Sequence, residues 1–339
     1  MAVGLNRQLV LVDRPKGPLA ETDFEYRETE IPEPGPGEAL TRTLYLSIDP
    51  ANRAWMSPVR TYVDPVQVGA VMDGFTLAQV VRSNVPGLEP GDLVESMNGW
   101  QDYRTLPGRV LHKVAPRRPL SMILSGLGVT AKTAYFGLLE VGRPVAGETV
   151  VVSAAAGATG SVAGQIARIH GCRVVGLAGS DDKCRFLTET LKFDEAINYR
   201  NDDVRKALAA ACPRGIDVYF DNVGGEILEA CLFRMNDRGR VVCCGAVSQY
   251  DTGRPAAGPR GVPGLLVVKR LRMEGFIVMD HYARRAQAEE ALAAWIADGR
   301  LVIREDVIDG LEHAPRALIG VLHGDNVGKR LVRVVPDAG

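Results

Sequence analysis

The spacing of apolar and polar positions divides the chain into two parts with different patterns. Before about residue 125, short apolar segments are separated by turns rich in proline and glycine, as at residues 38–46, 76–82, 92–97 and 110–114. Segments of this length and spacing predict a compact, partly open β-barrel. From about residue 125, apolar strands alternate with helical segments, a pattern typical of a parallel sheet wound with helices on both faces.

The alternating part can be followed element by element. After a first strand near residue 149 and a helix at 161–170, we expect strands at 172–177, 196–198, 217–220, 240–244 and 273–278, and helices at 182–190, 203–211, 226–235 and 284–297. The last of these helices is amphipathic and is stopped by Gly299. Its apolar face is formed by Ala288, Leu292, Trp295 and Ile296.

Two segments depart from this alternation. Residues 253–264 form a Gly/Pro-rich loop that is too long for a connecting turn, so we expect either a functional lid or a segment that faces a partner. The tail, residues 301–335, returns to strands with one short helix.

The most informative stretch is residues 149–164. A β-branched run is followed by a turn of small residues and then by a helix, the arrangement of a dinucleotide fingerprint of the form G/A-x-G-x-x-G. Ala155 takes the place of the first glycine, and Gly157 and Gly160 lack the Cβ atoms that would keep a pyrophosphate away from the backbone. We therefore predict that a pyrophosphate binds the free N–H groups at the start of this helix.

The tip of the second strand distinguishes between the two nicotinamide cofactors. An NAD site would place Asp or Glu there for the ribose hydroxyls, whereas this chain has Gly179 and Ser180, followed by Lys183. A small tip followed by a cation favours the 2′-phosphate of NADP. The alternative is that Ser180 caps a helix and Lys183 is solvated, and Asp181 and Asp182 keep NAD possible.

Length and charge narrow the function classes. At 339 residues, two domains are expected. A net charge of −1 gives no electrostatic attraction to nucleic acid or to an anionic membrane. We expect no apolar run long enough to span a bilayer, because the richest segment is broken by Ser, Thr and Gly. The N-terminus has no signal-peptide core, so a cytoplasmic protein is predicted.

The cysteines and histidines bear on metal binding. All six cysteines follow residue 171 and none forms a C-x-x-C pair, which favours reduced core thiols. The first 171 residues contain only two histidines, His112 and His170, and His112 is expected to be an exposed strand residue. A catalytic zinc site of cysteines and histidine, or a four-cysteine structural site, cannot be assembled in that half.

Several motifs together resemble the zinc-free prostaglandin reductase, curcumin reductase and alkenal double-bond reductase branch of the medium-chain dehydrogenase/reductase superfamily. They are LSIDP at 46–50, GWQDY at 99–103, TAYFG at 133–137, AAAGATG at 154–160, AGSDDK at 178–183, DNVGG at 221–225, CGAVSQY at 244–250 and GDNVGK at 324–329. The resemblance implies a Rossmann NADP-binding domain at 125–299, inserted into a GroES-like catalytic domain formed by 1–124 and 300–339.

The resemblance also implies a set of residues that bind NADP(H). They are Ala155, Gly157, Ala158, Thr159 and Gly160 at the phosphate turn; Lys183 and Tyr199 at the 2′-phosphate, with Gly179 and Ser180 nearby; Asn222 in the cleft; Gly245, Ala246 and Val247, with Phe276, Ile277 and Val278, around the nicotinamide; and Asn326 from the tail.

Some of these residues have another interpretation. Tyr199 could be a strand-end aromatic, with Arg200 as the phosphate ligand. The segment 221–225 could be merely a turn, although its place after a strand's carboxyl end favours ligand binding. Without the resemblance, Asn326 would be assigned to a turn. Ala51 stands where the family commonly has an aromatic residue, which implies a roomier or differently shaped substrate pocket.

The implied reaction is NADPH-dependent reduction of the α,β carbon–carbon double bond of enones and enals. Hydride adds to the β-carbon, and negative charge develops on the carbonyl oxygen before a proton follows. Without zinc, a neutral donor must stabilise this enolate oxygen. Tyr250 is the first candidate and Tyr62 the second, and a ribose hydroxyl of the cofactor could share the task.

Two other functions remain open. The protein could be a zinc-free NADPH quinone or carbonyl reductase, although the missing zinc ligands argue against alcohol oxidation. It could also be an NADPH-binding sensor or partner protein without useful turnover, against which the retained Tyr250 argues. The expected partners are a small-molecule enone or enal and, by family analogy, a second copy in a homodimer, with no nucleic acid and no membrane.

Overall fold

The computed structural model describes residues 4–252 and 258–335. The chain divides into two compact units. The first unit comprises Met1–Leu124, Glu305–Asn326 and Arg330–Gly339, and the second comprises Ser125–Arg304 and Val327–Lys329. The chain thus enters the second unit at residue 125 and returns to the first at residue 305. The sequence predicts this return at residue 300.

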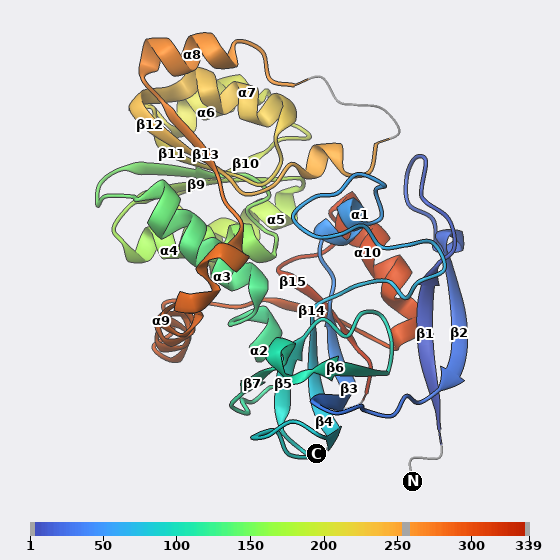
Figure 1. Ribbon diagram of the computed structural model, residues 1–339. Coiled ribbons are helices and arrows are strands. Elements are labelled where there is room, and N and C mark those ends of the chain that lie inside the picture. Colours follow the sequence, from blue (N-terminus) through green and yellow to red (C-terminus); the bar gives the residue numbers. More distant parts are fainter. Residues whose placement is uncertain (1–3, 253–257, 336–339) are drawn as a thin grey trace. The chain divides into compact units, whose positions relative to one another are not determined.

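The first unit is built mainly from antiparallel strands (Figure 1). Strands β1 (Leu5–Leu11) and β2 (Phe24–Glu30) pair with each other. The larger sheet has the order β14-β15-β3-β4-β5-β7, with β6 also paired to β3. Its strands are β3 (Glu38–Ser47), β4 (Thr76–Ser83), β5 (Leu93–Ser96), β6 (Tyr103–Pro107), β7 (His112–Val114), β14 (Glu305–Asp309) and β15 (Lys329–Arg333).

The first unit also contains helices, and one of them comes from the tail. Helix α1 (Ala51–Trp55) follows β3, and α10 (Ala314–His323) lies between β14 and β15. The buried residues Ala317 and Leu318 of α10 pack in one cluster with Leu46 and Trp100. Residues more than 200 positions apart therefore share one hydrophobic core.

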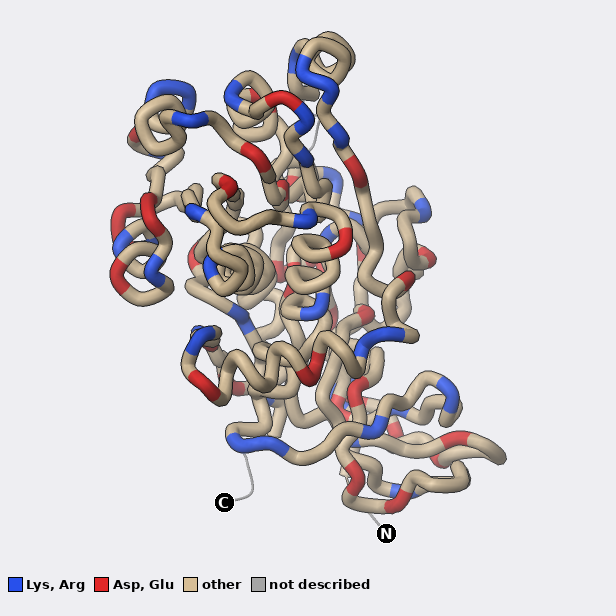
Figure 2. The backbone as a smooth tube through the Cα atoms, turned by 90° about the vertical axis from the view of Figure 1, so that its left-hand side faces the viewer, with Lys and Arg blue, Asp and Glu red and all other residues tan. Residues whose placement is uncertain are grey.

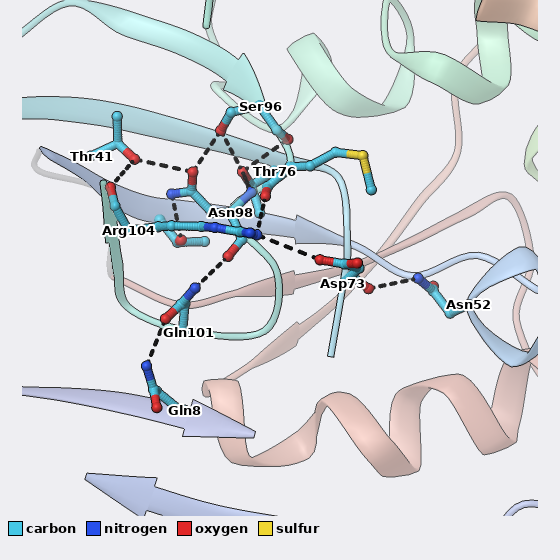
Figure 3. A network of polar contacts seen from close by, with 11 residues as sticks. Gln8, Thr41, Asn52, Asp73, Thr76, Ser96, Asn98, Gln101 and Arg104 are labelled. Atoms are coloured by element: carbon cyan, nitrogen blue, oxygen red, sulfur yellow. Dashed lines mark hydrogen bonds and ion pairs between the residues drawn. The ribbon is translucent and has the colours of Figure 1, made fainter. Parts of the chain in front are cut away.

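A buried polar network holds the first unit's strands together (Figure 3). The Oδ1 atom of Asn98 accepts hydrogen bonds from the hydroxyls of Thr41 and Ser96, at 3.0 and 2.8 Å. Its amide nitrogen donates to Thr43 Oγ1, and its carbonyl accepts from Gln101 Nε2 at 2.7 Å. Because a buried polar group without a partner is costly, this mutual satisfaction fixes the positions of β3, β5 and the loop before β6.

The second unit is a parallel sheet in the order β10-β9-β8-β11-β12-β13 (Figure 1). This agrees with the predicted doubly wound sheet. The strands are β8 (Thr149–Val152), β9 (Arg173–Ala178), β10 (Glu195–Asn198), β11 (Ile216–Asp221), β12 (Met235–Cys243) and β13 (Arg272–Gly275).

Helices cover both faces of this sheet, and the alternation of side chains explains why β8 is apolar throughout. Val150 and Val152 belong to the hydrophobic cluster that includes residues of α3, α4 and α9. Val151 points to the other cluster, which includes residues of α6, α7 and α8. The helices are α3 (Val129–Phe136), α4 (Ala158–Ile169), α5 (Asp181–Arg185), α6 (Val204–Ala211), α7 (Gly225–Arg234), α8 (Val262–Lys269) and α9 (Arg285–Ala297).

The Gly/Pro-rich stretch differs from its prediction as one long loop. Residues 262–269 form α8, with Pro263 in its first turn, where proline needs no hydrogen-bond partner. Residues 253–257 lie outside the described residues. The strand predicted at 273–278 ends at Gly275, and Val278 begins a short 3₁₀ helix.

One helical stretch differs from the expectation that no apolar run is long enough to span a bilayer. Residues Met122–Gly142, beginning with α2 (Met122–Ser125), are long and apolar enough to cross a membrane by length and composition, contrary to expectation. However, 78% of the most apolar window is buried inside the protein, as in a core helix. The stretch is therefore weak support for a membrane span.

Charged residues of both signs are interspersed along the chain (Figure 2). Many of them pair with each other, as Arg240 does with Glu148 and Arg330 with Asp306. This mixture accompanies the net charge of −1.

Candidate functional site

The turn after β8 has the geometry of a phosphate-binding turn. Gly157 is the N-cap of α4, and Ala154 adopts a left-handed φ of 47°. A Cβ atom on Gly160 would meet the carbonyl oxygen of Ala154 and would lie 2.9 Å from Cα of Ala155, so only glycine fits there. The N–H groups of Ala158, Thr159 and Gly160 have no partner within the helix, because they belong to its first turn. They can therefore hold an anion.

Ala155 contributes to this turn through packing. It is fully buried, its N–H donates to the carbonyl of Leu177, and its methyl group would lie 2.9 Å from a Cβ on Gly176. The small residues Ala155 and Gly176 thus bring the turn close to β9.

The tip of β9 gathers several of the predicted phosphate ligands. A Cβ atom on Gly179 would lie 2.8 Å from the hydroxyl oxygen of Tyr199 and 3.3 Å from Nε of Arg200, so both side chains lie against this glycine. Ser180 is the N-cap of α5, and its hydroxyl accepts from the N–H of Lys183 at 3.3 Å. Ser180 therefore caps the helix, and Lys183 stands in the helix's first turn.

The carboxylates near this tip are engaged with other groups. Oδ1 of Asp181 accepts from the side-chain amide of Asn198 at 2.6 Å, and Asp182 pairs with Arg185 on its own helix. A ribose hydroxyl would have to compete for these oxygens. Together with the cations of Lys183 and Arg200, this arrangement fits a phosphate better than a hydroxyl.

The turn after β11 is tied to the turn after β8. The backbone N–H of Asn222 donates to Ser153 Oγ at 2.9 Å, and its side-chain amide donates to the carbonyl of Ser153 at 2.7 Å. Strands β8 and β11 are neighbours on opposite sides of the point where the strand order reverses. Open α/β sheets bind ligands at such a point.

The turn after β12 rests on the turn after β11. The N–H of Gly245 donates to the carbonyl of Asp221 at 3.1 Å, and the N–H of Val247 donates to the carbonyl of Asn222 at 3.2 Å. The hydroxyl of Tyr250 accepts from the N–H of Ala246 at 3.2 Å. These bonds form one continuous ledge, residues 221–225 and 244–250, at the carboxyl edge of the sheet.

Tyr250 can serve as a hydrogen-bond donor from this ledge. Because its oxygen accepts from Ala246, its own hydrogen can be directed to another acceptor. Burial raises the pKa of Tyr250, against the smaller opposing effect of the Ala246 N–H. The phenol is therefore protonated at neutral pH and can donate.

The remaining predicted residues lie elsewhere. The ring of Phe276 packs against Gly137, where a Cβ atom would lie 2.7 Å from Cε1 of the ring, and Val278 is part of the hydrophobic core beside it. Ile277 is the N-cap of the 3₁₀ helix that follows. Tyr62, which is 48% exposed, and the buried Asn326 both belong to the first unit.

Two contributors to the site were missed in the sequence. Ser153 links the turns after β8 and β11, and its only signal was a hydroxyl at the end of an apolar strand. Gly328 donates its N–H to the carbonyl of Ala156 at 2.7 Å, which brings residues 327–329 beside the phosphate turn. The tail motif at 324–329 was the available signal.

Comparison with known proteins identifies similar domains and full-length relatives. Residues 7–114 match a family described as the N-terminal domain of oxidoreductase, and residues 158–298 match one described as zinc-binding dehydrogenase. The chain is 43% identical to an NADPH-dependent curcumin reductase of Escherichia coli, with 98% of each chain covered. It is 41% identical to a 2-alkenal reductase (NADP⁺-dependent) of Nicotiana tabacum, with 97% of each covered.

A mammalian relative and a solved structure extend this similarity. Prostaglandin reductase 1 of Rattus norvegicus is 40% identical, over 92% of this chain and 94% of the relative. The crystal structure of CurA from Vibrio vulnificus in complex with NADPH is 40% identical and has a TM-score of 0.92. That comparison covers 98% of this chain and all of the other.

Proposed function

Because the chain belongs to the zinc-free prostaglandin, curcumin and alkenal reductase branch of the medium-chain dehydrogenase/reductase superfamily, we propose that it reduces the α,β carbon–carbon double bond of enones and enals with NADPH. One observation carries the proposal. Relatives that cover more than 90% of the chain are named as reductases of curcumin, 2-alkenals and prostaglandins. Curcumin and 2-alkenals each contain a double bond conjugated to a carbonyl.

The second unit binds NADP(H) in this proposal. The pyrophosphate lies at the first turn of α4, over Gly157 and Gly160. The 2′-phosphate lies at the tip of β9, where Lys183, Tyr199 and Arg200 surround Gly179. A bidentate guanidinium and a lysine together suit a dianionic phosphate.

The ledge provides the rest of the cofactor site. Asn222, with Gly245, Ala246 and Val247, flanks the nicotinamide. The backbone of Ile277 also approaches the nicotinamide in this proposal. Phe276 and Val278 pack in the hydrophobic core behind this segment. Asn326, in the tail, stays a predicted cofactor ligand.

Tyr250 stabilises the enolate. The bound cofactor supplies the hydride, which adds to the β-carbon of the substrate. Tyr250 then donates its hydrogen to the carbonyl oxygen as negative charge develops there, and the N–H of Ala246 orients the hydroxyl. Tyr62 is the second candidate for this role.

The proposed reaction uses no metal. Among the described residues, no group of three or more His, Cys, Asp or Glu side chains could hold an ion. The family that residues 158–298 match is described as zinc-binding dehydrogenase, and we propose that the donor in this chain is instead a neutral hydroxyl. The first unit, with residues 1–124 and 300–339, holds the substrate, and Ala51 leaves its pocket roomier than an aromatic residue would.

We also propose a cytoplasmic homodimer. All six cysteines are free, as in proteins of a reducing compartment. Strand β13 is an edge of the parallel sheet, and the nearby α8 exposes Val267 and Val268 at 75% and 69%. A second copy that pairs along this edge would cover both features.

A steady-state comparison of substrates tests the proposed reaction. NADPH oxidation is followed with 2-nonenal or another enal, a simple enone, a quinone and a saturated aldehyde, and the products are identified by mass spectrometry. The proposal predicts turnover of the enal and enone to saturated carbonyl products. Turnover of the quinone or the saturated aldehyde alone would favour a quinone or carbonyl reductase, and no turnover with tight NADPH binding would favour a sensor.

A further inference from the structure

Asp221, the last residue of β11, is a buried carboxylate held only by neutral groups. Its side chain is almost fully buried, with the residue 2% exposed. Its Oδ1 atom accepts from the hydroxyl of Tyr219 at 2.8 Å, from the N–H groups of Val223 and Gly224 at 3.0 and 2.9 Å, and from Ser153 Oγ at 3.3 Å.

None of the described cationic side chains pairs with this carboxylate. Among residues 4–252 and 258–335, none of the lysine or arginine side chains forms an ion pair with Asp221. Buried charges are ordinarily paired, because removing a charge from water is costly. Burial raises the pKa of Asp221, and the four hydrogen bonds to Oδ1 oppose this effect by favouring the anion. They stabilise the carboxylate, but they do not neutralise it as an ion pair would.

The field of Asp221 reaches the ledge. The main-chain carbonyl of Asp221 accepts from the N–H groups of Cys244 and Gly245, at 2.9 and 3.1 Å, so the backbone of this residue touches the turn that follows β12. Its carboxylate accepts from the N–H groups of Val223 and Gly224, and therefore lies against the part of the ledge that follows β11. Burial is the main reason that the pKa of Cys244 is raised to about 12, and the charge of Asp221 contributes in the same direction. The pKa of Tyr250 is also raised mainly by burial, and the charge of Asp221 again contributes in the same direction.

We propose that the carboxylate of Asp221 stabilises the positive charge of the oxidised nicotinamide ring and thereby favours hydride release. The inference rests on the proposed function, in which the ring lies beside Gly245, Ala246 and Val247. Loss of a hydride, with its two electrons, converts the neutral dihydronicotinamide into a cationic pyridinium, and the hydride forms the new C–H bond at the substrate's β-carbon. An uncompensated anion in a medium of low dielectric lowers the energy of that cation.

The two forms of the cofactor separate this role from a structural one. NADPH and NADP⁺ carry the same phosphates, so repulsion between those phosphates and Asp221 affects both alike. Only the ring differs in charge. The ratio of their dissociation constants therefore reports the field of Asp221 at the ring.

The test replaces Asp221 in the full-length protein. Asp221→Asn keeps an oxygen that can accept from Val223 and Gly224 and removes the charge. Dissociation constants for NADPH and NADP⁺ are measured by fluorescence and calorimetry, without substrate. The ratio of the NADP⁺ constant to the NADPH constant should rise at least about tenfold, the effect of one charge within roughly 12 Å at an effective dielectric of about 20.

Two further variants keep the test decisive. Asp221→Ser is also neutral and can accept the same turn hydrogen bonds, so it should shift the ratio in the same direction if the Asn variant does not fold. Tyr219→Phe removes a hydrogen bond to the carboxylate but retains the charge, so the ratio should not rise. Equal loss of both affinities in the Asn and Ser variants, or no change in either, would overturn the electrostatic role.

Failure of this inference can be told apart from failure of the proposed function. The binding ratio needs no substrate, so absence of enone reduction leaves the test intact. An unchanged ratio in a protein that does reduce enones would reject only the role assigned to Asp221.

Discussion

The replacement of Tyr250 by phenylalanine separates a hydrogen-bond donor from a wall residue, because phenylalanine keeps the ring and removes the hydroxyl. In the native protein the hydroxyl accepts from the N–H of Ala246 at 3.2 Å and has one hydrogen to give. The variant therefore loses one structural hydrogen bond and the proposed donor to the enolate. These two losses have different consequences and can be measured separately.

The structural loss is small. A neutral hydrogen bond contributes about 0.5–1.5 kcal/mol to stability, so Tyr250→Phe should lower the free energy of unfolding by about 1 kcal/mol. The catalytic loss is larger, because the buried surroundings that raise the pKa of Tyr250 also shield a developing oxyanion from water. Removal of such a donor should lower kcat by roughly ten- to a hundredfold, or about 1.4–2.7 kcal/mol of transition-state stabilisation.

Steady-state kinetics with an enone provide the assay. A transition-state donor lowers kcat and kcat/KM together, whereas a residue that only packs against substrate changes mainly KM. Tyr62→Phe is the matched control, because it removes the hydroxyl of the second candidate and should leave kcat near the parent value. If Tyr250→Phe turns over enones at the parent rate, the reasoning is refuted, and a large loss in Tyr62→Phe would transfer the role to Tyr62.

Three further predictions concern the cofactor site and the metal. Lys183→Ala should raise the KM for NADPH by about ten- to a hundredfold and hardly change the KM for NADH, since a charge-assisted contact contributes about 1.5–3 kcal/mol. Lys206→Ala is the control. An equal rise in KM for both cofactors in Lys183→Ala would exclude the phosphate role. Gly160→Ala should destabilise the protein by about 1–3 kcal/mol in denaturant unfolding and weaken NADPH binding, because its methyl group would overlap the backbone of the phosphate turn. Gly275→Ala, which meets open space, should do neither, and a stable Gly160→Ala variant with full affinity would contradict the geometry. Dialysis against a strong chelator should leave enone turnover unchanged, and activity restored specifically by zinc would overturn the metal-free mechanism.

The parallel sheet could be predicted because its determinants are local. Val150, Val151 and Val152 are all fully buried, on alternating faces, and an unbroken β-branched run is the pattern that such a strand requires. The left-handed and close-approach positions of the phosphate turn also select small residues directly. Most element boundaries in this part therefore differ from the prediction by a few residues, although β12 begins at Met235 and the predicted strand begins at 240.

The errors arose where long-range contacts decide the structure. The predicted loop at 253–264 includes the first three residues of α8, which contain proline and glycine. Leu265 packs against the cluster beneath the sheet and holds this segment as a helix. The sequence predicts no apolar run long enough to span a bilayer, yet Met122–Gly142 is long and apolar enough, and most of its apolar window is buried in the core. Neither outcome follows from local propensity alone.

Some residues of the candidate site have a local signal in the sequence, and others depend on which strands are neighbours. The motif at 154–160 and the tip at Gly179 were recognisable because glycine is demanded there by close contacts. The role of Ser153 and the uncompensated carboxylate of Asp221 depend on neighbouring strands, and no spacing in the sequence reveals which strands are adjacent. The contact of Arg200 with Gly179 could be stated only as an alternative for the same reason.

Transfer of an isotopic label shows directly whether the hydride of NADPH adds to the β-carbon of an enone. The protein is supplied with an enone and with NADPH that carries deuterium at C4 of the nicotinamide, in each of the two stereochemical forms, and the product is examined by NMR. The proposed reaction predicts a saturated ketone in which one of the two forms delivers deuterium to the β-carbon and the carbonyl is retained. Deuterium on the carbonyl carbon of an alcohol product, or NADPH oxidation with no label in the product, would contradict it.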